Sequence, residues 1–465
     1  MDVLLTHAYF LEEDPLERVV MKPYPPLGLL YISSHLKAQG FDVEVMDATF
    51  SNRRDFEQHL TDRRPPVIGI YVTLMTRQNA LWAIQIAKHI GARVVLGGPE
   101  PINYCEEYLT QGADVIVAGE GETALEKLIP LLRDGHMQAL GSIPGIAYRN
   151  ENNKIQHTAP GTQIRDLDAQ PFPDREAIDL GKYLDTWQAH HGKRTVSLVT
   201  ARGCPYTCKW CSHSVYGFSH RRRSPQNVAD EVELIRDRYD PDEVWYADDV
   251  FTISKPWLES YAAELARRDI RIPFETITRE DRLDERTVKT LASMGCYRIW
   301  IGAESGSQRI LDAMSRRTDV ARLRQMIQLL QRHGIRAGTF IMVGYDGETW
   351  RDIDETSRHL NAALPDDLLT TLSYPIKGTP YFEQVKDRIV ALRPWDEGSD
   401  RDYTVAGRYS RRFYLHAQRW LRYELNVAQE RSKPKPSLRT LMRNLVRAKS
   451  NRAAMYLTRH QVERG

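Results

Sequence analysis

The sequence predicts an α/β protein with two parallel sheets in series: a doubly wound sheet, then a partial (β/α)6 barrel, then a basic helical region. Three observations support this. Short β-branched runs alternate with helical patterns over residues 1–140 and again over 195–385, which is typical of parallel strands joined by crossover helices. Residues 141–194 lose this alternation and contain several Pro and Asn residues. Residues 386–465 are rich in arginine.

The first region contains five predicted strands, at 3–8, 42–47, 67–73, 93–97 and 114–118. Helices are predicted at 27–39, 56–63, 78–90 and 104–111, and Gly40 suits a left-handed cap after the first. Open parallel sheets bind ligands beyond the carboxyl ends of their strands. Glycine there lets a ligand approach the backbone, although tight turns would give the same pattern. The candidate residues at these ends are Thr73, Leu74, Met75, Gly97, Gly98, Pro99, Glu120 and Gly121.

Between the two regions, residues 141–194 predict a linker with a two-stranded hairpin around an Asn-rich turn. Six barrel strands follow at 195–200, 243–247, 274–278, 298–303, 338–343 and 368–373, with helices at 228–238, 257–267, 284–294, 320–333 and 350–363. The apolar stripe of the helix at 320–333 is expected to be core. Six βα units in series favour an active site at the carboxyl ends of the strands.

Three cysteines, Cys204, Cys208 and Cys211, follow the first barrel strand in a C-x3-C-x2-C spacing. Thiolates hold iron–sulfur clusters, and three of them on one loop could bind three irons of a cubane and leave the fourth iron open. A structural zinc site normally has four ligands, usually as two separated pairs. Only His213 and His220 lie near enough in sequence to complete one, so iron–sulfur is favoured over zinc.

Two acids and an arginine come next along the same end of the barrel. Asp248 and Asp249 end the second strand, where they could receive a cationic amine or cap the following helix. Arg279 follows the third strand and could clamp a carboxylate or form a surface ion pair with Asp281.

The fourth and fifth strands end in residues that suit a nucleoside. Glu304 and Ser305 follow the fourth strand, and a carboxylate at that depth suits the two neighbouring hydroxyls of a ribose. Gly344 follows the fifth strand, where it would let an adenine approach the backbone.

The cysteine spacing, with Trp210 just before the last cysteine, resembles the radical S-adenosylmethionine (SAM) superfamily over residues 195–385. The resemblance implies a TIM-type barrel whose three cysteines hold a 4Fe-4S cluster that cleaves SAM to a 5′-deoxyadenosyl radical. It implies that Ala247-Asp248-Asp249 stands where the family binds the SAM amino group, Glu304 where it contacts the ribose, and Arg279 where many members hold the carboxylate. Asp248 and Asp249 replace the commoner Gly-Gly-Glu.

A doubly wound sheet before such a barrel resembles the cobalamin-binding subfamily, which includes carbon methyltransferases and the anaerobic porphyrin-ester cyclase. The segments 25–28, 97–99 and 119–122 match its N-terminal pattern. The resemblance implies a flavodoxin-like, Rossmann-like cobalamin-binding domain over residues 1–140. No D-x-H-x-x-G motif is present, so no histidine is expected as lower axial ligand. Thr73 to Met75 are the candidate neighbours of that face.

Composition bounds the location and partners of the protein. The sequence has no run of 18 apolar residues, no secretory signal pattern and five cysteines, which together favour the cytoplasm. Residues 401–465 carry a balance of +12 and residues 1–400 one of −10. The basic end could contact nucleic acid, an anionic membrane or a phosphorylated substrate, but packing against the acidic remainder is favoured. The run at 220–223 could face an anionic substrate or, more commonly, solvent.

We therefore expect a radical SAM enzyme with cobalamin as second cofactor that methylates an unactivated carbon of a small molecule, natural product or lipid. Its reductant would be a protein such as flavodoxin or ferredoxin. One alternative is radical oxidation, ring formation or another rearrangement of the cyclase type, which uses the same cofactors. A second alternative is a non-catalytic metal-cluster protein that binds nucleic acid.

Overall fold

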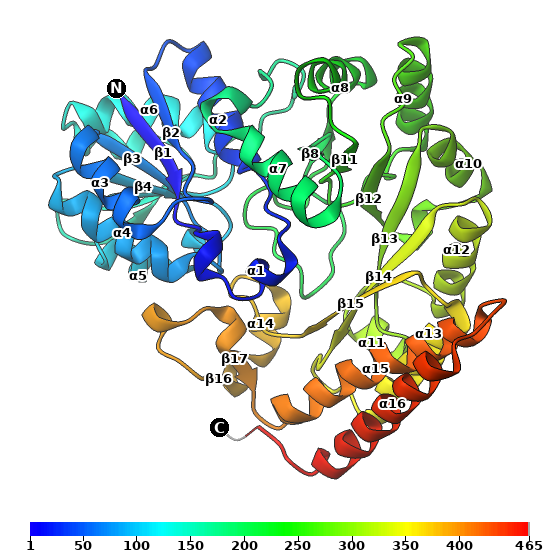
Figure 1. The fold of residues 1–465 in the computed structure, drawn as a ribbon. Coiled ribbons are helices and arrows are strands. Elements are labelled where there is room, and N and C mark those ends of the chain that lie inside the picture. Colours follow the sequence, from blue (N-terminus) through cyan, green and yellow to red (C-terminus); the bar gives the residue numbers. More distant parts are fainter. Residues whose placement is uncertain (464–465) are drawn as a thin grey trace.

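Two β-sheets organise the chain, and a computed structural model describes residues 1–463. Figure 1 shows the first sheet and its helices, in blue to cyan, beside an arc formed by the second sheet and its helices, in green to yellow. The helices of the second unit lie on the outside of the arc, and the first unit lies across its open side. The two-sheet architecture predicted from the sequence is therefore confirmed.

The first sheet has seven strands in the order β2-β1-β3-β4-β5-β6-β7. On β1, Leu4 packs with the cluster that contains α3, α4 and α5 residues, whereas Val3 and Leu5 pack with residues of α2 and α6. Alternate residues of one strand thus serve opposite faces, as a doubly wound sheet requires. The parallel strands are β1 (Val3–His7), β2 (Val43–Met46), β3 (Val67–Tyr71), β4 (Arg93–Gly97) and β5 (Val115–Val117). The helices are α2 (Leu27–Ala38), α3 (Arg53–Arg63), α4 (Arg77–His89), α5 (Cys105–Thr110) and α6 (Glu122–Arg133).

The predicted hairpin exists, but it belongs to the first sheet and not to a separate linker. Its strands are β6 (Ile146–Arg149) and β7 (Ile155–His157), and β6 pairs antiparallel with β5. Because β5 would otherwise leave its backbone groups unpaired at a sheet edge, the hairpin completes the sheet. The first sheet therefore extends to residue 157, beyond the expected boundary at residue 140. Farther on, α7 (Leu180–His191) packs against the core of the second unit.

The second sheet has six parallel strands in the order β15-β14-β13-β12-β11-β8. The two end strands do not pair, so the sheet is an open, partial barrel. The strands are β8 (Thr195–Leu198), β11 (Glu243–Tyr246), β12 (Phe274–Thr278), β13 (Cys296–Glu304), β14 (Arg336–Val343) and β15 (Asp367–Leu372). The helices are α8 (Pro225–Tyr239), α9 (Lys255–Arg267), α10 (Glu285–Ser293), α11 (Gln308–Ala313), α12 (Val320–Arg332) and α13 (Trp350–Ala363).

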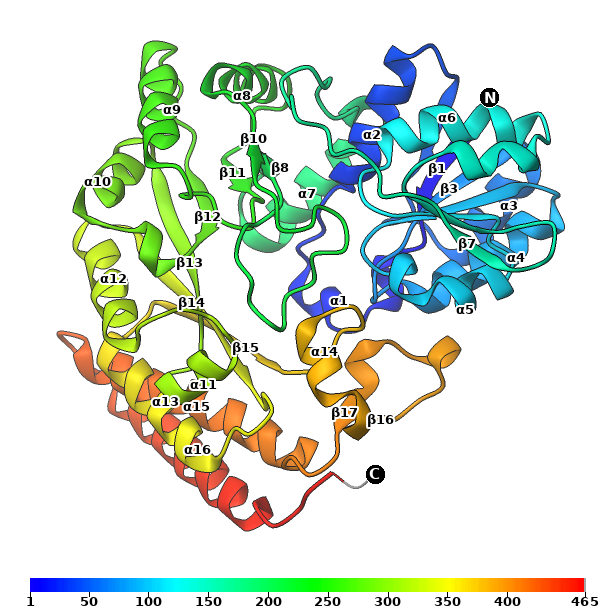
Figure 2. The same ribbon diagram turned by 180° about the vertical axis from the view of Figure 1, so that it is seen from behind.

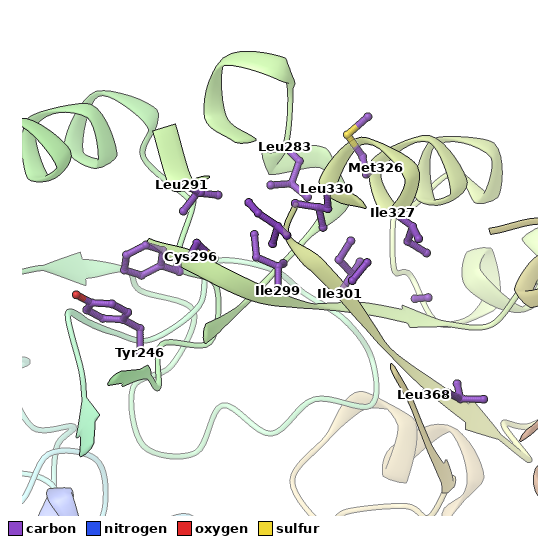
Figure 3. Close-up of a cluster of buried hydrophobic side chains, with 14 of the residues drawn as sticks. Tyr246, Leu283, Leu291, Cys296, Ile299, Ile301, Met326, Ile327, Leu330 and Leu368 are labelled. Carbon is purple, nitrogen blue, oxygen red and sulfur yellow. The ribbon is translucent and has the colours of Figure 1, made fainter. Parts of the chain in front are cut away.

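The main core lies between this sheet and its outer helices. Figure 3 shows Ile299 and Ile301 of β13 in one cluster with Met326, Ile327 and Leu330 of α12, and all five side chains are buried. The helical stripe expected to be core is therefore core.

Two cysteines outside the triad are also buried in hydrophobic clusters. Cys296 lies in the cluster of Figure 3, and Cys105 lies in the cluster on the face of the first sheet that α3, α4 and α5 cover. Both behave as small buried residues, as expected from their sequence context.

The C-terminal region has two parts with different neighbours. A short ribbon, β16 (Ile389–Ala391) and β17 (Tyr403–Val405), follows α14 (Pro380–Val385). Two long helices, α15 (Arg411–Ser432) and α16 (Leu438–Thr458), then form an antiparallel pair in which α15 packs on the barrel through buried residues such as Phe413 and Trp420. Packing within the chain, the favoured expectation, is thus found for α15. Among residues 1–463, no helix combines the length and apolar character that a bilayer crossing needs.

A buried ion-pair cluster attaches this region to the first sheet. Arg77 at the start of α4 donates hydrogen bonds of 2.6 Å to both Glu100 and Asp400, and all three side chains are at most 4% exposed. Burial raises the pKa of Glu100 to about 7, although the charge on Arg77 opposes this. Asp400 also accepts a hydrogen bond from the backbone N–H of Lys377. One arginine thus joins residues more than 300 positions apart.

We predict that Arg77→Met destabilises the protein by about 3 to 5 kcal/mol, because it leaves two buried carboxylates without their cation. The matched control is Arg53→Met, which removes an arginine that is 46% exposed and paired with Glu13, and should cost less than about 1 kcal/mol. Urea unfolding of both variants measures the difference. Equal losses would show that the Arg77 cluster adds nothing beyond a surface pair.

Candidate active site

A pocket with about 840 Å³ of empty space lies at the carboxyl end of the second sheet. Its wall comes from the loop after β8 and from residues that follow β11, β12 and β13. This is the place where a parallel barrel builds an active site. The residues on the pocket wall that the sequence predicted are Cys204, Cys208, Trp210, Cys211, Asp249, Arg279 and Glu304.

The three cysteine thiols meet at this pocket and form no disulfide. Burial raises the pKa of all three thiols, that of Cys211 to about 12. Thiols in such surroundings ionise when a metal compensates their charge, so the donor set suits a thiolate-ligated metal. Among residues 1–463, no three His, Cys, Asp or Glu side chains are grouped as ligands of one metal ion. A cubane cluster instead gives each thiolate a different iron.

Glu304 is directed into the pocket by an irregularity of β13. The register between β13 and β14 shifts between Gly302 and Glu304, and Glu304 has a φ of +63°. Such a bulge re-aims a side chain, and the left-handed backbone is costly for a residue other than glycine. A Cβ on Gly302 would lie 2.6 Å from the Glu304 carboxylate, so this glycine provides the space. Burial raises the pKa of Glu304 to about 8, while Arg279 opposes the shift.

Arg279 lies against the cysteine loop, and its donors are already used. Its Nε donates to Asp281 at 2.9 Å, and one Nη donates to the backbone oxygen of Arg316 at 2.9 Å. The other Nη lies 3.9 Å from the sulfur of Cys208, and the guanidinium stacks on the ring of Tyr206. Arg279 therefore holds the pocket wall together.

Arg316 is a pocket residue that the sequence reasoning missed. It is 5% exposed, its Nε lies 4.0 Å from Glu304, and one Nη donates to the Gly302 carbonyl at 2.7 Å. The other Nη is buried and has no hydrogen-bond partner within the described part of the chain. No strand precedes Arg316 directly, so the position of strand ends gave no signal for it.

The two acids after β11 have separate environments. Asp248 is 2% exposed and accepts hydrogen bonds from the backbone N–H groups of Thr200 and Ala201 and from Arg222 at 2.7 Å. Asp249 instead lines the pocket, where burial and the charge on Asp248 raise its pKa. Of these two acids, only Asp249 lines the pocket where an amine would bind.

Three other predicted residues lie off the pocket. Ala247 is exposed and its N–H donates to Leu198 of the neighbouring strand. Ser305 is fully buried, and its hydroxyl bonds within its own turn and to Thr356. Gly344 gives its N–H to Glu348, and a Cβ there would meet Leu372 and Tyr414, so its adenine contact stays a prediction.

The three arginines of the basic run at 220–223 form buried ion pairs, so this run is not a solvent face. Arg221 pairs with Glu120, Arg222 with Asp248, and Arg223 with Glu231, in each case with little exposure. The run therefore fixes the cysteine loop to its surroundings.

A second pocket, with about 700 Å³ of empty space, lies at the carboxyl ends of the first sheet. Glycines form much of its wall, and Cβ atoms added to Gly28 and Gly97 would project into open space. A Cβ on Gly98, whose φ is +100°, would lie 2.5 Å from the carbonyl of Val72, so only glycine fits there. Four of the residues predicted to bind a ligand line this pocket: Gly97, Gly98, Glu120 and Gly121.

The other predicted residues of the first domain lie elsewhere. Leu74 and Met75 line a different pocket beside Arg77 and Arg401, Thr73 hydrogen-bonds to Thr76 in its own turn, and the Pro99 carbonyl accepts from Ser214. The structure does not bring Thr73 to Met75 to the wall of the glycine-lined pocket. No histidine lines it within the described residues.

One loop separates the two pockets. Residues Cys211 to His213 face the cysteine pocket, and Val215 and Tyr216 face the glycine-lined pocket. The loop runs between the two units in both views of the fold (Figure 2). Two molecules bound in these pockets would thus share a wall.

A buried ion-pair cluster fixes this junction. Arg202 at the start of the loop pairs with Glu120 and Glu122 at 2.6 and 2.7 Å, and Arg221 pairs with Glu120 at 2.6 Å. All four side chains are at most 11% exposed. The first domain contributes the acids of this cluster, and the barrel contributes the arginines.

The geometry defines an α/β protein with a cysteine-lined pocket on an open barrel and a second pocket on a doubly wound domain. Comparison of the sequence with protein families agrees. A radical SAM superfamily model matches residues 198–360, and a B12 binding domain model matches residues 16–129.

Two relatives cover most of the chain. The uncharacterised methyltransferase PH0819 of Pyrococcus horikoshii is 28% identical to this chain, and the match covers 84% of this chain and 84% of the length of PH0819. The anaerobic magnesium-protoporphyrin IX monomethyl ester cyclase of Rubrivivax gelatinosus is 27% identical over 79% of this chain and 67% of its own.

Solved structures share the fold. OxsB, a cobalamin-dependent radical SAM enzyme with aqua-cobalamin bound, superposes with a TM-score of 0.74 at 18% identity, over 98% of this chain and 72% of its own. The methyltransferase TsrM of Kitasatospora setae gives a TM-score of 0.67 at 19% identity, over 83% and 74%.

The chain therefore carries a radical SAM domain, and a B12-binding domain precedes it. The expected cofactors, a 4Fe-4S cluster, SAM and cobalamin, are those of these two domains, so the predicted pairing of domains is confirmed.

The raised pKa of Glu304 predicts a pH-dependent cost to folding. Burial raises its pKa from the ordinary 4.5, which it has in the unfolded chain, to about 8 in the folded protein. Its contribution to folding stability is therefore fully present below pH 4.5 and is lost as the pH rises through 8. We predict that, without ligands, Glu304→Gln gains stability relative to the parent by up to about 1.4 kcal/mol per pH unit in that window. Urea unfolding at pH 5, 6.5 and 8 measures this, and a constant difference would contradict it.

Proposed function

We propose that the protein is a cobalamin-dependent radical SAM methyltransferase that methylates an unactivated carbon of a small-molecule, natural-product or lipid substrate. The observation that carries the proposal is the single loop that lines both the cysteine pocket and the glycine-lined pocket. When bound, the cluster supplies the electron that cleaves SAM to a 5′-deoxyadenosyl radical, and cobalamin supplies a carrier for a methyl group. A reductant such as flavodoxin or ferredoxin is part of the proposal.

The cysteine pocket supplies a different group for each part of SAM. Cys204, Cys208 and Cys211 would hold the cluster, because their thiols line the pocket together. Glu304, aimed inward by the bulge, suits the ribose hydroxyls. Asp249 is the acid available for the amino group, since Asp248 is saturated with donors from the loop and from Arg222.

We assign the SAM carboxylate to Arg316 and not to Arg279. Arg316 has a buried guanidinium nitrogen without a partner, on the wall of the pocket. An unpaired buried donor is costly, and a carboxylate would satisfy it. Arg279, whose donors serve Asp281, the Arg316 carbonyl and Cys208, positions the loop that carries Arg316.

The glycine-lined pocket suits one flat, apolar face of a large ligand. Gly28 and Gly97 leave open space where side chains would protrude, and aliphatic side chains from several strands complete the wall. Tyr216 and Arg202 of the barrel close it on the side of the cysteine loop. These residues would hold cobalamin between the two units and exclude water from the shared wall.

A second candidate reaction is radical oxidation with ring formation. The relative from Rubrivivax gelatinosus favours it, because that protein is named as a cyclase and matches the chain nearly as well as PH0819. Methylation remains the favoured reaction since the first relative is named as a methyltransferase.

The cluster assignment predicts a sharp effect of single cysteine substitutions. Cys208→Ala should remove the absorption of the reconstituted cluster and abolish 5′-deoxyadenosine formation from SAM and reductant, whereas Cys296→Ala should retain both, because Cys296 is buried in the hydrophobic core. Anaerobic reconstitution followed by chromatography of nucleosides measures this. Absence of 5′-deoxyadenosine from the parent protein would reject the proposed enzymatic activity.

A second experiment separates the two candidate reactions. With methyl-labelled SAM, label in the product supports methylation, and an unlabelled oxidised product supports the cyclase alternative.

The Arg316 assignment predicts a loss that depends on the ligand. Arg316→Ala should weaken binding of S-adenosylhomocysteine about 10- to 100-fold, the value of a charged hydrogen bond. Binding of 5′-methylthioadenosine, which lacks the carboxylate, should change little. Arg317→Ala, at an exposed neighbour, is the matched control. Equilibrium dialysis of the reconstituted protein measures both ligands. Equal losses for the two ligands would show that Arg316 has only a structural role.

A further inference from the structure

The outer face of α16 has no partner within residues 1–463. Helix α16 rests on α15 through Asn444, Ala448 and Met455, which are at most 6% exposed. Figure 1 and Figure 2 show α16, in red, as the outermost layer, with α15 between it and the barrel. The opposite side of the helix therefore faces outward along its whole length.

Large apolar side chains form a row on this outer face. Leu438, Met442 and Val446 follow one another at intervals of four residues and are 75%, 58% and 60% exposed. Leu457, at the far end, is 80% exposed. Residues four apart lie on one side of a helix, so Leu438, Met442 and Val446 form an apolar stripe, and Leu457 lies farther along the same side. Such a stripe costs free energy in water and marks an interaction surface.

A row of arginines borders the stripe. Arg439, Arg443 and Arg447 each follow a stripe residue by one position, which places them along one edge. The helix also carries Lys449 and Arg452 and contains no acidic residue from Leu438 to Thr458. Among the described residues, Arg439, Arg443 and Lys449 form no ion pair; Arg452 pairs with Asp354 at 2.9 Å.

We propose that this face of α16 binds the surface of an anionic lipid bilayer. A basic helix with an exposed apolar stripe lies in the membrane interface, with its apolar side chains among the acyl chains and its cations at the lipid phosphates. Helix α16 has 21 residues and is about 30 Å long, so it can lie along the surface. The face thus anchors the enzyme from the side of the barrel and does not cross the bilayer.

The same features disfavour two other occupants. Nucleic acid would satisfy the arginines but leave the apolar stripe in water. A second copy packed stripe to stripe would bring two unpaired arginine rows together, which charge repulsion opposes. An anionic bilayer satisfies both the cations and the stripe.

Vesicle flotation with the full chain tests the proposal. We expect the protein to float with vesicles of phosphatidylcholine and phosphatidylglycerol in a 7:3 ratio, and not with phosphatidylcholine alone. Raising the salt from 0.1 to 1 M should weaken binding by screening. Neutralising two arginines, in Arg439→Gln/Arg443→Gln, should weaken binding about 25-fold, since each cation near such a surface contributes about fivefold.

Two further variants separate the stripe from the general charge of the protein. Leu438→Ser/Met442→Ser should abolish flotation without changing net charge. Arg54→Gln/Arg332→Gln, at exposed arginines of α3 and α12, carries the same charge change as the arginine variant and should float like the parent. Circular dichroism of every variant confirms that the helices remain folded.

Four outcomes would overturn the proposal. The parent protein fails to float with anionic vesicles, or both pairs of arginine changes reduce flotation equally. Light scattering without lipid shows a dimer that Leu438→Ser/Met442→Ser dissociates, which assigns the face to a second copy. A 20-base-pair RNA binds the parent, and only the α16 arginine variant loses it while the serine variant does not, which assigns the face to nucleic acid. Formation of 5′-deoxyadenosine, which is independent of α16, distinguishes any of these from failure of the proposed function.

Discussion

The buried ion pairs of Arg202 and Arg221 with Glu120 and Glu122 determine how the two units of this protein are joined. Charges that are removed from water are stable only when they are paired, so this cluster favours the docked arrangement of the two units. The acids follow β5 of the first sheet, and the arginines flank the cysteine loop of the barrel. Together with the bond from Ser214 to the Pro99 carbonyl and the attachment of Asp400 to Arg77, this contact fixes the relative position of the two pockets.

The same principle divides neighbouring residues of the barrel into support and site. Asp248 holds the start of the cysteine loop through Thr200, Ala201 and Arg222, whereas Asp249, one residue later, faces the pocket. Arg279 and Arg316 are divided likewise. In each pair the residue with saturated hydrogen bonds fixes the backbone, and the residue with unused capacity remains available to a ligand.

The sequence predicts what depends on local periodicity and on strand ends. All eleven parallel strands, the three cysteines and Glu304 were foreseen, because a βα repeat places its loops at one edge of the sheet. What depends on distant packing was not. Gly344 is covered by Tyr414 from α15, Arg316 enters the pocket from a turn between helices, and the hairpin after residue 145 completes the first sheet. None of these contacts leaves a periodic signal.

The ion pair between Asp400 and Arg77 brings the C-terminal region of the chain back to the N-terminal domain. The two parts that match separate families are therefore linked by buried ion pairs as well as by the chain. Cutting the chain between the first sheet and the barrel would leave Arg202 on one piece without its acids and Arg77 on the other without Asp400. To replace the barrel with that of another superfamily member, one would have to transfer the junction arginines and the C-terminal ribbon with it. Otherwise the buried acids of the first domain would lose their partners.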